Sequence, residues 1–154
     1  MRIFLAVPFR SKINKTTGVV HKEYKKWLLS LKSFLTNLGF DVYLALEREN
    51  WGKDFWKDED CTRIDHKEIT DSDIVIAYVD EEFSGGVHIE LGWASTLGKK
   101  IAIVTKDESC LCPLAKGLIS LCDLEVIVFS SESELHNKLT RFLRSTSRFP
   151  NSGW

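Results

Sequence analysis

Glu90 is the residue whose surroundings in the sequence point most directly to chemistry. It lies in the largely apolar segment 87–97. Helical spacing would place it on one face with Trp93, Ala94 and Leu97. A carboxylate among apolar side chains is costly unless it is paired, and such carboxylates concentrate at functional sites. We therefore predict that Glu90 is a reactive group.

Asp65 is the second candidate carboxylate. Its helical neighbours four residues away are Cys61 and Ile69, which indicates a face turned inward, but the polar segment suits a solvated acidic residue equally well. Two carboxylates that reach one site suit the acid and nucleophile roles of cleavage at an acetal-like carbon, as in glycoside hydrolysis.

The turn Ser84-Gly85-Gly86 opens the helix that carries Glu90. Backbone N–H groups at the positive end of a helix dipole form a natural phosphate cradle, although a glycine pair before a helix also suits a plain turn. Arg10, on a loop expected to face this turn, would be a bidentate anion partner. Together these residues favour an anion site.

Other site classes find little support in the sequence. The four histidines are not clustered, His88 is expected to be structural, and the four cysteines lack zinc spacing, so we expect no metal and reduced thiols. Neither a Walker lysine motif nor G-x-G-x-x-G is present, which disfavours nucleoside triphosphates and dinucleotides. No cofactor is expected.

Length and composition indicate one domain over residues 1–154, ending in an irregular tail at 145–154. A hydrophobic fraction of 44%, a charged fraction of 28% and a net charge of −1 suit a globular protein without attraction to nucleic acid or membrane surfaces. No apolar run approaches the ~20 residues of a membrane span. The start, MRIFLAVPFR, does not resemble a signal peptide, so a cytoplasmic location is expected.

Short apolar segments alternate with helical patterns along the chain. The predicted strands are 2–7, 41–46, 73–78, 101–104 and 124–129, and the predicted helices are 24–38, 61–69, 84–98, 113–121 and 131–143. This alternation predicts a doubly wound α/β fold: a five-stranded, mostly parallel sheet in the order 2-1-3-4-5 with helices on both faces. The crevice of such a sheet lies outside the carboxyl ends of strands 1 and 3.

The rim of this crevice would come from Pro8-Phe9-Arg10, from the turn at Ser84, and from segment 47–60, which we expect to be a loop. That segment contains Trp51 and two further aromatic residues, Phe55 and Trp56. These rings either plug the core from outside or form a stacking wall for a flat ligand.

Three segments resemble the nucleoside 2-deoxyribosyltransferases and the related nucleoside 5′-monophosphate N-glycosidases: IFLAVPFR, IDHKEITDSDIVIAYVD and SGGVHIELGWASTLGKKIAIV. The specific part is a glycine-containing loop followed by E-L-G-x-A. The alternation of elements matches to about Phe129, although residues 11–60 match only in pattern.

The resemblance implies roles for the candidate residues. Glu90 would be the nucleophile that attacks the anomeric carbon of a nucleoside sugar, and Asp65 would be the acid that helps the base depart. The turn at Ser84 would hold the 5′ end of the sugar. Trp51 and its neighbours, with Phe9, would enclose the base.

Two positions refine the expected substrate. Transferases that use free nucleosides commonly carry an acidic residue six before the nucleophile, where this chain has Ser84, as the monophosphate hydrolases do. A serine hydroxyl can donate to a phosphate that a carboxylate would repel. Phe4 stands where deoxyribosyl enzymes commonly have a tyrosine near the 2′ carbon, which leaves room for a ribose 2′-hydroxyl.

The leading expectation is hydrolysis of a nucleoside 5′-monophosphate to free base and sugar 5-phosphate. The alternatives are a 2-deoxyribosyltransferase that exchanges bases, and a non-catalytic nucleotide-binding module. Proteins of this family are usually oligomers in which a neighbouring subunit completes the pocket, so we expect a homodimer with residues 111–117 near the partner's site. Cys112 would lie there, or serve only as a small buried thiol. The base is not identified by the sequence.

Overall fold

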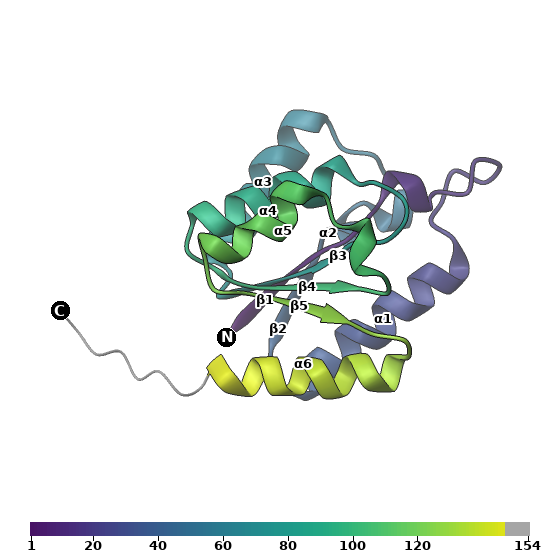
Figure 1. Cartoon of the computed structure of the whole chain (residues 1–154). Coiled ribbons are helices and arrows are strands. Elements are labelled where there is room, and N and C mark those ends of the chain that lie inside the picture. Colours follow the sequence, from purple (N-terminus) through teal and green to yellow (C-terminus); the bar gives the residue numbers. More distant parts are fainter. Residues whose placement is uncertain (147–154) are drawn as a thin grey trace.

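The computed structural model describes residues 1–146, in which five strands form a parallel sheet (Figure 1). The strand order is β2-β1-β3-β4-β5, and every neighbouring pair is parallel, which confirms the predicted fold class and order. The strands are β1 (Arg2–Ala6), β2 (Asp41–Leu44), β3 (Ile74–Tyr78), β4 (Lys100–Thr105) and β5 (Leu124–Val128).

Helices cover both faces of the sheet. Figure 1 shows α1 (Lys22–Asn37) and α6 (Glu132–Thr146) on one face, with α3 (Asp58–Asp71), α4 (Gly85–Thr96) and α5 (Pro113–Gly117) on the other. The predicted tail began at residue 145, but α6 continues to Thr146, and residues 147–154 lie outside the described part of the chain.

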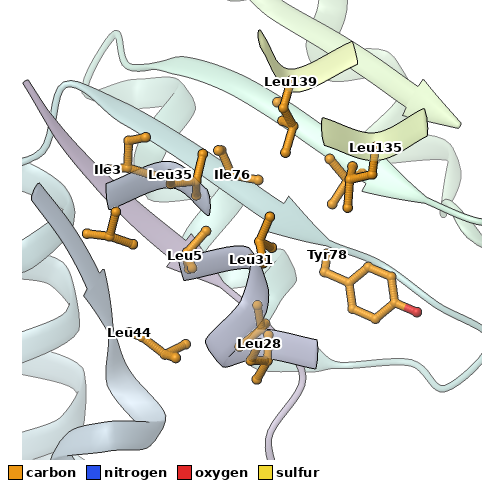
Figure 2. Close-up of a cluster of buried hydrophobic side chains, with 14 of the residues drawn as sticks. Ile3, Leu5, Leu28, Leu31, Leu35, Leu44, Ile76, Tyr78, Leu135 and Leu139 are labelled. Atoms are coloured by element: carbon orange, nitrogen blue, oxygen red, sulfur yellow. The ribbon is translucent and has the colours of Figure 1, made fainter. Parts of the chain in front are cut away.

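The core lies on both sides of the sheet because side chains alternate along each strand. In β1, Ile3 and Leu5 join the core under α1 and α6, and Phe4 joins the core under α3 and α4. Figure 2 shows leucines of α1 and α6 packed on the first of these faces. All five residues of β3 are buried, so two-sided burial explains its uninterrupted apolar run.

The segment after β2 differs from the prediction. The predicted strand ran to residue 46, but β2 ends at Leu44, and the chain continues into the short helix α2 (Ala45–Arg48) and a 3-10 turn (Asn50–Gly52). Leu46 is buried against the core just as a strand residue would be, so alternation alone could not mark the end of the strand. Gly52 has φ +96°, and an added Cβ would lie 3.0 Å from the Gly18 carbonyl oxygen, so this turn requires glycine.

Two further properties concern the helices and the cysteines. None of the helices formed by residues 1–146 is long and apolar enough to cross a membrane. The four cysteines are all free thiols, as their spacing predicted.

Candidate active site

A cleft of about 400 Å³ opens at the carboxyl ends of β1, β2 and β3, where the strand order reverses between β1 and β3. The chain leaving each of these strands contributes to its wall. Predicted residues that line the cleft together are Phe9, Arg10, Asp65, Ser84, Gly85, Gly86 and Glu90.

Glu90 reaches the cleft from the second turn of α4. Val87, Leu91 and Ala94 of the same helix are buried in the core, which fixes the helix and therefore the position of the carboxylate. Glu90 makes no hydrogen bond or ion pair with any residue of the described chain. Burial raises its pKa well above the ordinary glutamate value, and the charge of Asp65 raises it further, although Arg48 acts in the opposite direction.

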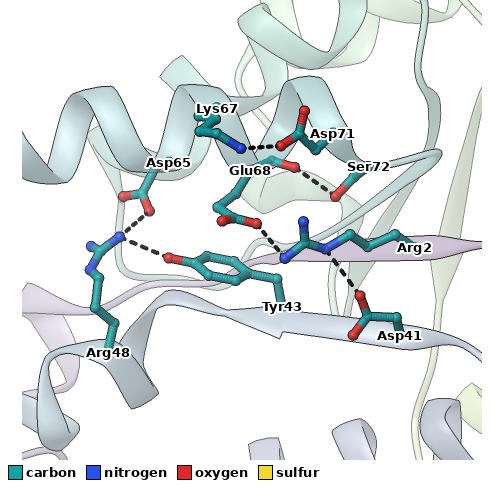
Figure 3. Close-up of polar contacts among 9 residues, drawn as sticks. All are labelled: Arg2, Asp41, Tyr43, Arg48, Asp65, Lys67, Glu68, Asp71 and Ser72. Carbon is teal, nitrogen blue, oxygen red and sulfur yellow. Dashed lines mark hydrogen bonds and ion pairs between the residues drawn. The ribbon is translucent and has the colours of Figure 1, made fainter.

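Asp65 lies on α3 and faces inward, which decides between its two predicted environments. Its side chain is 16% exposed, and its Oδ1 accepts a hydrogen bond of 2.7 Å from Nη1 of Arg48 (Figure 3). Burial raises the pKa of Asp65, whereas the hydrogen bond and the charge of Arg48 lower it. The two carboxylates therefore differ, because only Asp65 has a cation partner.

Arg48 lies at the centre of a network behind the cleft. Its Nη1 also donates to the Tyr43 hydroxyl at 2.9 Å, and its Nη2 donates to Oε1 of Glu49 at 3.0 Å. One turn along α3 from Asp65, Glu68 pairs with Nη2 of Arg2 at 2.5 Å (Figure 3). Arg2 of β1 and Arg48 of α2 thus hold α3 over the sheet, and Arg48 orients Asp65.

Ser84 is the N-cap of α4, and its hydroxyl oxygen accepts a hydrogen bond of 3.5 Å from the N–H of Val87. The N–H groups of Gly85 and Gly86 lie in the first turn, where helix geometry supplies no acceptor. An added Cβ would meet protein atoms only at 3.8 Å at Gly85 and 4.0 Å at Gly86, so packing does not require either glycine. Because neither glycine has a side chain, a group in the cleft can closely approach the backbone of the turn.

Arg10 borders the same cleft on the β1 side. Its side chain is 81% exposed and forms a 3.6 Å ion pair with Asp58, whose side chain is 90% exposed. Such an exposed pair contributes little to stability, so the guanidinium is available to a bound anion.

The predicted aromatic wall is divided between the cleft and the core. Phe55 stacks on Phe9 with ring centroids 5.9 Å apart, and both line the cleft together with Trp56. Trp51 instead is buried on the opposite side of the sheet among the residues under α1, with Nζ of Lys25 4.6 Å from the centre of its ring. Trp51 therefore belongs to the core, whereas Phe55 and Trp56 lie where rings that stack on a ligand would have to lie.

Phe4 and Pro8 also lie away from the cleft surface. Phe4 is fully buried and stacks on Tyr43 at 5.5 Å, because the parallel register of β1 and β2 places these two rings side by side. Pro8 is buried, and its carbonyl accepts a 2.9 Å hydrogen bond from the hydroxyl of Tyr24. Neither residue is among those that line the cleft, in contrast to the predicted substrate contacts.

Residues 17–138 match the sequence model of a family described as nucleoside 2-deoxyribosyltransferase. The chain belongs to this family. It is therefore a nucleoside-processing enzyme that acts as a glycosidase or a transferase.

Solved structures agree with this membership. The CMP N-glycosidase BcmB from Clostridium botulinum is 29% identical, with a TM-score of 0.72 over 92% of this chain and 99% of that chain. BlsM is 26% identical, with a TM-score of 0.80 over 99% of this chain and 97% of that chain. A 2-desoxiribosyltransferase from Leishmania mexicana, at 16% identity, 69% and 65% coverage and a TM-score of 0.53, shares the fold. A search among curated proteins finds no significant match.

In this member of the deoxyribosyltransferase family, the structure adds residues that the sequence did not reveal. Arg48 ends α2 and Glu49 follows it directly, within the segment 47–60 that the sequence predicts to be a loop and in which nothing distinguishes these two residues. The pairing of Arg48 with Asp65 spans 17 residues and leaves no periodic signal in the sequence. His88 hydrogen-bonds through Nδ1 to the Ser84 carbonyl at 2.7 Å, in keeping with a structural role. No group of three potential metal ligands occurs among residues 1–146.

Proposed function

We propose that the protein hydrolyses the N-glycosidic bond of a nucleoside 5′-monophosphate, releasing free base and sugar 5-phosphate. The observation that carries the proposal is the Ser84-Gly85-Gly86 turn at the N-terminus of α4, six residues before Glu90 and in the same cleft. It offers a hydroxyl, unpaired backbone donors and the positive end of a helix dipole to a phosphate. A carboxylate at the first position would repel that phosphate.

The cleft accommodates the three parts of such a substrate in order. The phosphate would lie on the turn, the sugar beside Glu90, and the base against the ring wall formed by Phe9, Phe55 and Trp56. The C. botulinum protein, whose chain is matched almost completely, is a CMP N-glycosidase, so CMP is the first substrate to test.

The reaction divides into two displacements. A carboxylate oxygen of Glu90 would attack C1′, the bond from C1′ to the base nitrogen would break, and the base would leave with a proton from Asp65. Water would then attack C1′ and give its proton to Asp65, and the ester bond to Glu90 would break. Both carboxylates return to their starting states, and the net reaction consumes one water.

Base exchange by a 2-deoxyribosyltransferase is the alternative, and the family description favours it. It differs only in the second step, in which another base replaces water at C1′. A non-catalytic binding module would not account for Glu90, whose carboxylate lacks any partner in the described chain and is costly to keep in this site.

The decisive assay supplies a panel of ribonucleosides, deoxyribonucleosides and their 5′-monophosphates, with and without a second free base, and separates products by chromatography. We expect free base from the monophosphates at equal rates with and without the second base. Formation of a new nucleoside from the added base would establish the transferase instead. The absence of any base release from the whole panel would contradict both enzymatic readings.

A further inference from the structure

Glu49 is a buried carboxylate that the proposed reaction does not use. It lies directly after α2, is only 6% exposed, and lines the cleft. Its Oε1 accepts a hydrogen bond from Nη2 of Arg48 at 3.0 Å and faces the thiol of Cys61 at 3.5 Å. Its Oε2 makes no hydrogen bond with any residue between 1 and 146. A nearly buried carboxylate therefore keeps one acceptor oxygen unused in a ligand cleft.

The topology places this oxygen at the end of the cleft where a base would lie. Glu49 follows β2, the turn at Ser84 follows β3, and β1 separates these strands in the sheet. A nucleotide whose phosphate lies on the turn and whose sugar lies beside Glu90 therefore extends its base toward the β2 side. Trp56 stands on that side, with its ring 5.5 Å from the guanidinium carbon of Arg48.

The chemistry of the unused oxygen restricts the base. A carboxylate oxygen only accepts hydrogen bonds, so it requires a base edge that donates. The exocyclic amino group of cytosine or adenine donates, whereas the corresponding positions of uracil and hypoxanthine carry carbonyl oxygens that a carboxylate repels. Arg48 fixes the carboxylate through a charge-assisted hydrogen bond, so Glu49 cannot easily turn away from the wrong base.

We propose that Glu49 selects bases that carry an exocyclic amino group, using the carboxylate oxygen that its pairing with Arg48 leaves free. This inference rests on the proposed function, because it assumes that the cleft holds a nucleotide. It adds a rule of specificity that neither Glu90 nor the phosphate turn supplies.

Matched substrate pairs test the rule: CMP against UMP, and AMP against IMP, which differ only in amino versus oxo substitution. We expect wild type to favour the amino member of whichever pair it cleaves by about 10- to 100-fold in kcat/KM, the range of one hydrogen bond to a charged group. Glu49→Gln keeps the shape and an acceptor for Arg48 but presents an amide that can donate to a carbonyl, so the ratio should fall at least 10-fold.

Glu47→Gln is the matched control, because Glu47 lies on α2, directly before Arg48, but is exposed and pairs with Lys32 outside the cleft. Its amino-to-oxo ratio should equal that of wild type. Equal cleavage of both members by wild type, or an unchanged ratio in Glu49→Gln, would overturn the role of Glu49 while leaving the hydrolase intact.

Binding measured by calorimetry separates this inference from the proposed function. If no nucleotide is cleaved but wild type binds CMP more tightly than UMP, and Glu49→Gln does not, then the hydrolase is refuted and the selection by Glu49 stands. If wild type binds CMP and UMP equally and also binds AMP and IMP equally, the selection is refuted, even when Glu49→Gln cannot be obtained folded.

Discussion

The two carboxylates of the cleft have different electrostatic surroundings. Asp65 has Arg48 at hydrogen-bonding distance, whereas Glu90 has no hydrogen-bond or ion-pair partner among residues 1–146, and its pKa is raised well above the ordinary value. These directions favour a proton on Glu90 over one on Asp65. The proposed reaction requires the opposite arrangement, with Glu90 ionised and Asp65 protonated.

This coupling predicts a bell-shaped pH dependence of kcat/KM in wild type, because the pair must hold one proton. Asp65→Asn should lower the rate by about 10²–10⁴-fold, the usual contribution of a general acid. It should also abolish the descending limb, because only Glu90 then titrates and activity rises to a plateau as it ionises. The substrate phosphate also titrates, but it does so equally with wild type and with Asp65→Asn, so it cannot cause a difference between their pH profiles. An unchanged rate, or a descending limb that persists in the variant, would remove Asp65 from the mechanism.

Glu90 should also reduce the stability of the fold. A glutamate whose pKa is raised by folding binds protons more tightly in the native state, so stability falls as pH rises from about 4.3 toward the raised pKa. Glu90→Gln removes this loss. We expect it to abolish base release and to raise Tm at pH 7 by about 2–4 °C for each kcal/mol recovered. The gain should shrink at pH 4, and a gain that does not depend on pH would contradict the account.

At the scale of elements, a substitution in the N-terminal turn of α4 should affect phosphate binding without destabilising the fold. Gly86→Ala adds a methyl group that meets protein only at 4.0 Å, in a helix, where alanine is favoured over glycine by about 0.5–1 kcal/mol. We expect an unchanged or slightly raised Tm and a raised KM for the 5′-monophosphate, because the methyl group obstructs close approach of the phosphate. Cleavage of the matching unphosphorylated nucleoside serves as the internal control. Equal effects on both substrates would place the phosphate elsewhere.

The elements themselves followed from the sequence wherever periodicity was unambiguous. The buried strands, the amphipathic α1 and the glycine-opened α4 were predicted because each has a pattern that one structure satisfies. The prediction failed after Leu44, where a buried residue of a short helix continues the alternation of a strand. Segment 47–60 was placed at the rim of the crevice, but no feature of the sequence distinguished Arg48 and Glu49 within it.

The same distinction separates the site residues that the sequence predicted from those that it misplaced. Glu90 and the Ser84 turn were predictable because local sequence determines a helix start and its second turn. The burial of Trp51, Phe4 and Pro8 away from the cleft depends on contacts across the sheet, and no local spacing encodes them. Trp51 has a positive φ of 60°, and its side chain lies in the core under α1 rather than in the cleft.

At the scale of the whole molecule, an apolar groove of about 730 Å³ lies between α4 and the segment after β4. Exposed Leu114 and Leu121 border it, as does Phe83, which also lines the cleft. Exposed apolar patches of this kind mark interaction surfaces. A second copy seated there would lie next to the cleft, in keeping with the expected role of residues 111–117.

We therefore expect a homodimer in sedimentation equilibrium at micromolar concentration. Leu114→Glu and Leu121→Glu should each shift the protein toward monomer, because they introduce a charge into the apolar surface. Leu38→Glu is the control, since Leu38 is an exposed apolar residue at the end of α1 on the other face of the sheet. A wild-type protein that remains monomeric throughout the concentration range would exclude this assembly.

The central claim, that the cleft is built for a 5′-phosphate, is tested most directly by kcat/KM for CMP and cytidine at fixed ionic strength, in wild type and in Ser84→Asp. We predict that wild type favours CMP by about 10- to 100-fold or more, since each charge-assisted hydrogen bond contributes about 1.5–3 kcal/mol. Ser84→Asp should reverse the preference, because a carboxylate repels the phosphate and accepts from a free 5′-hydroxyl. A wild-type enzyme that prefers cytidine would contradict the phosphate site and favour a transferase.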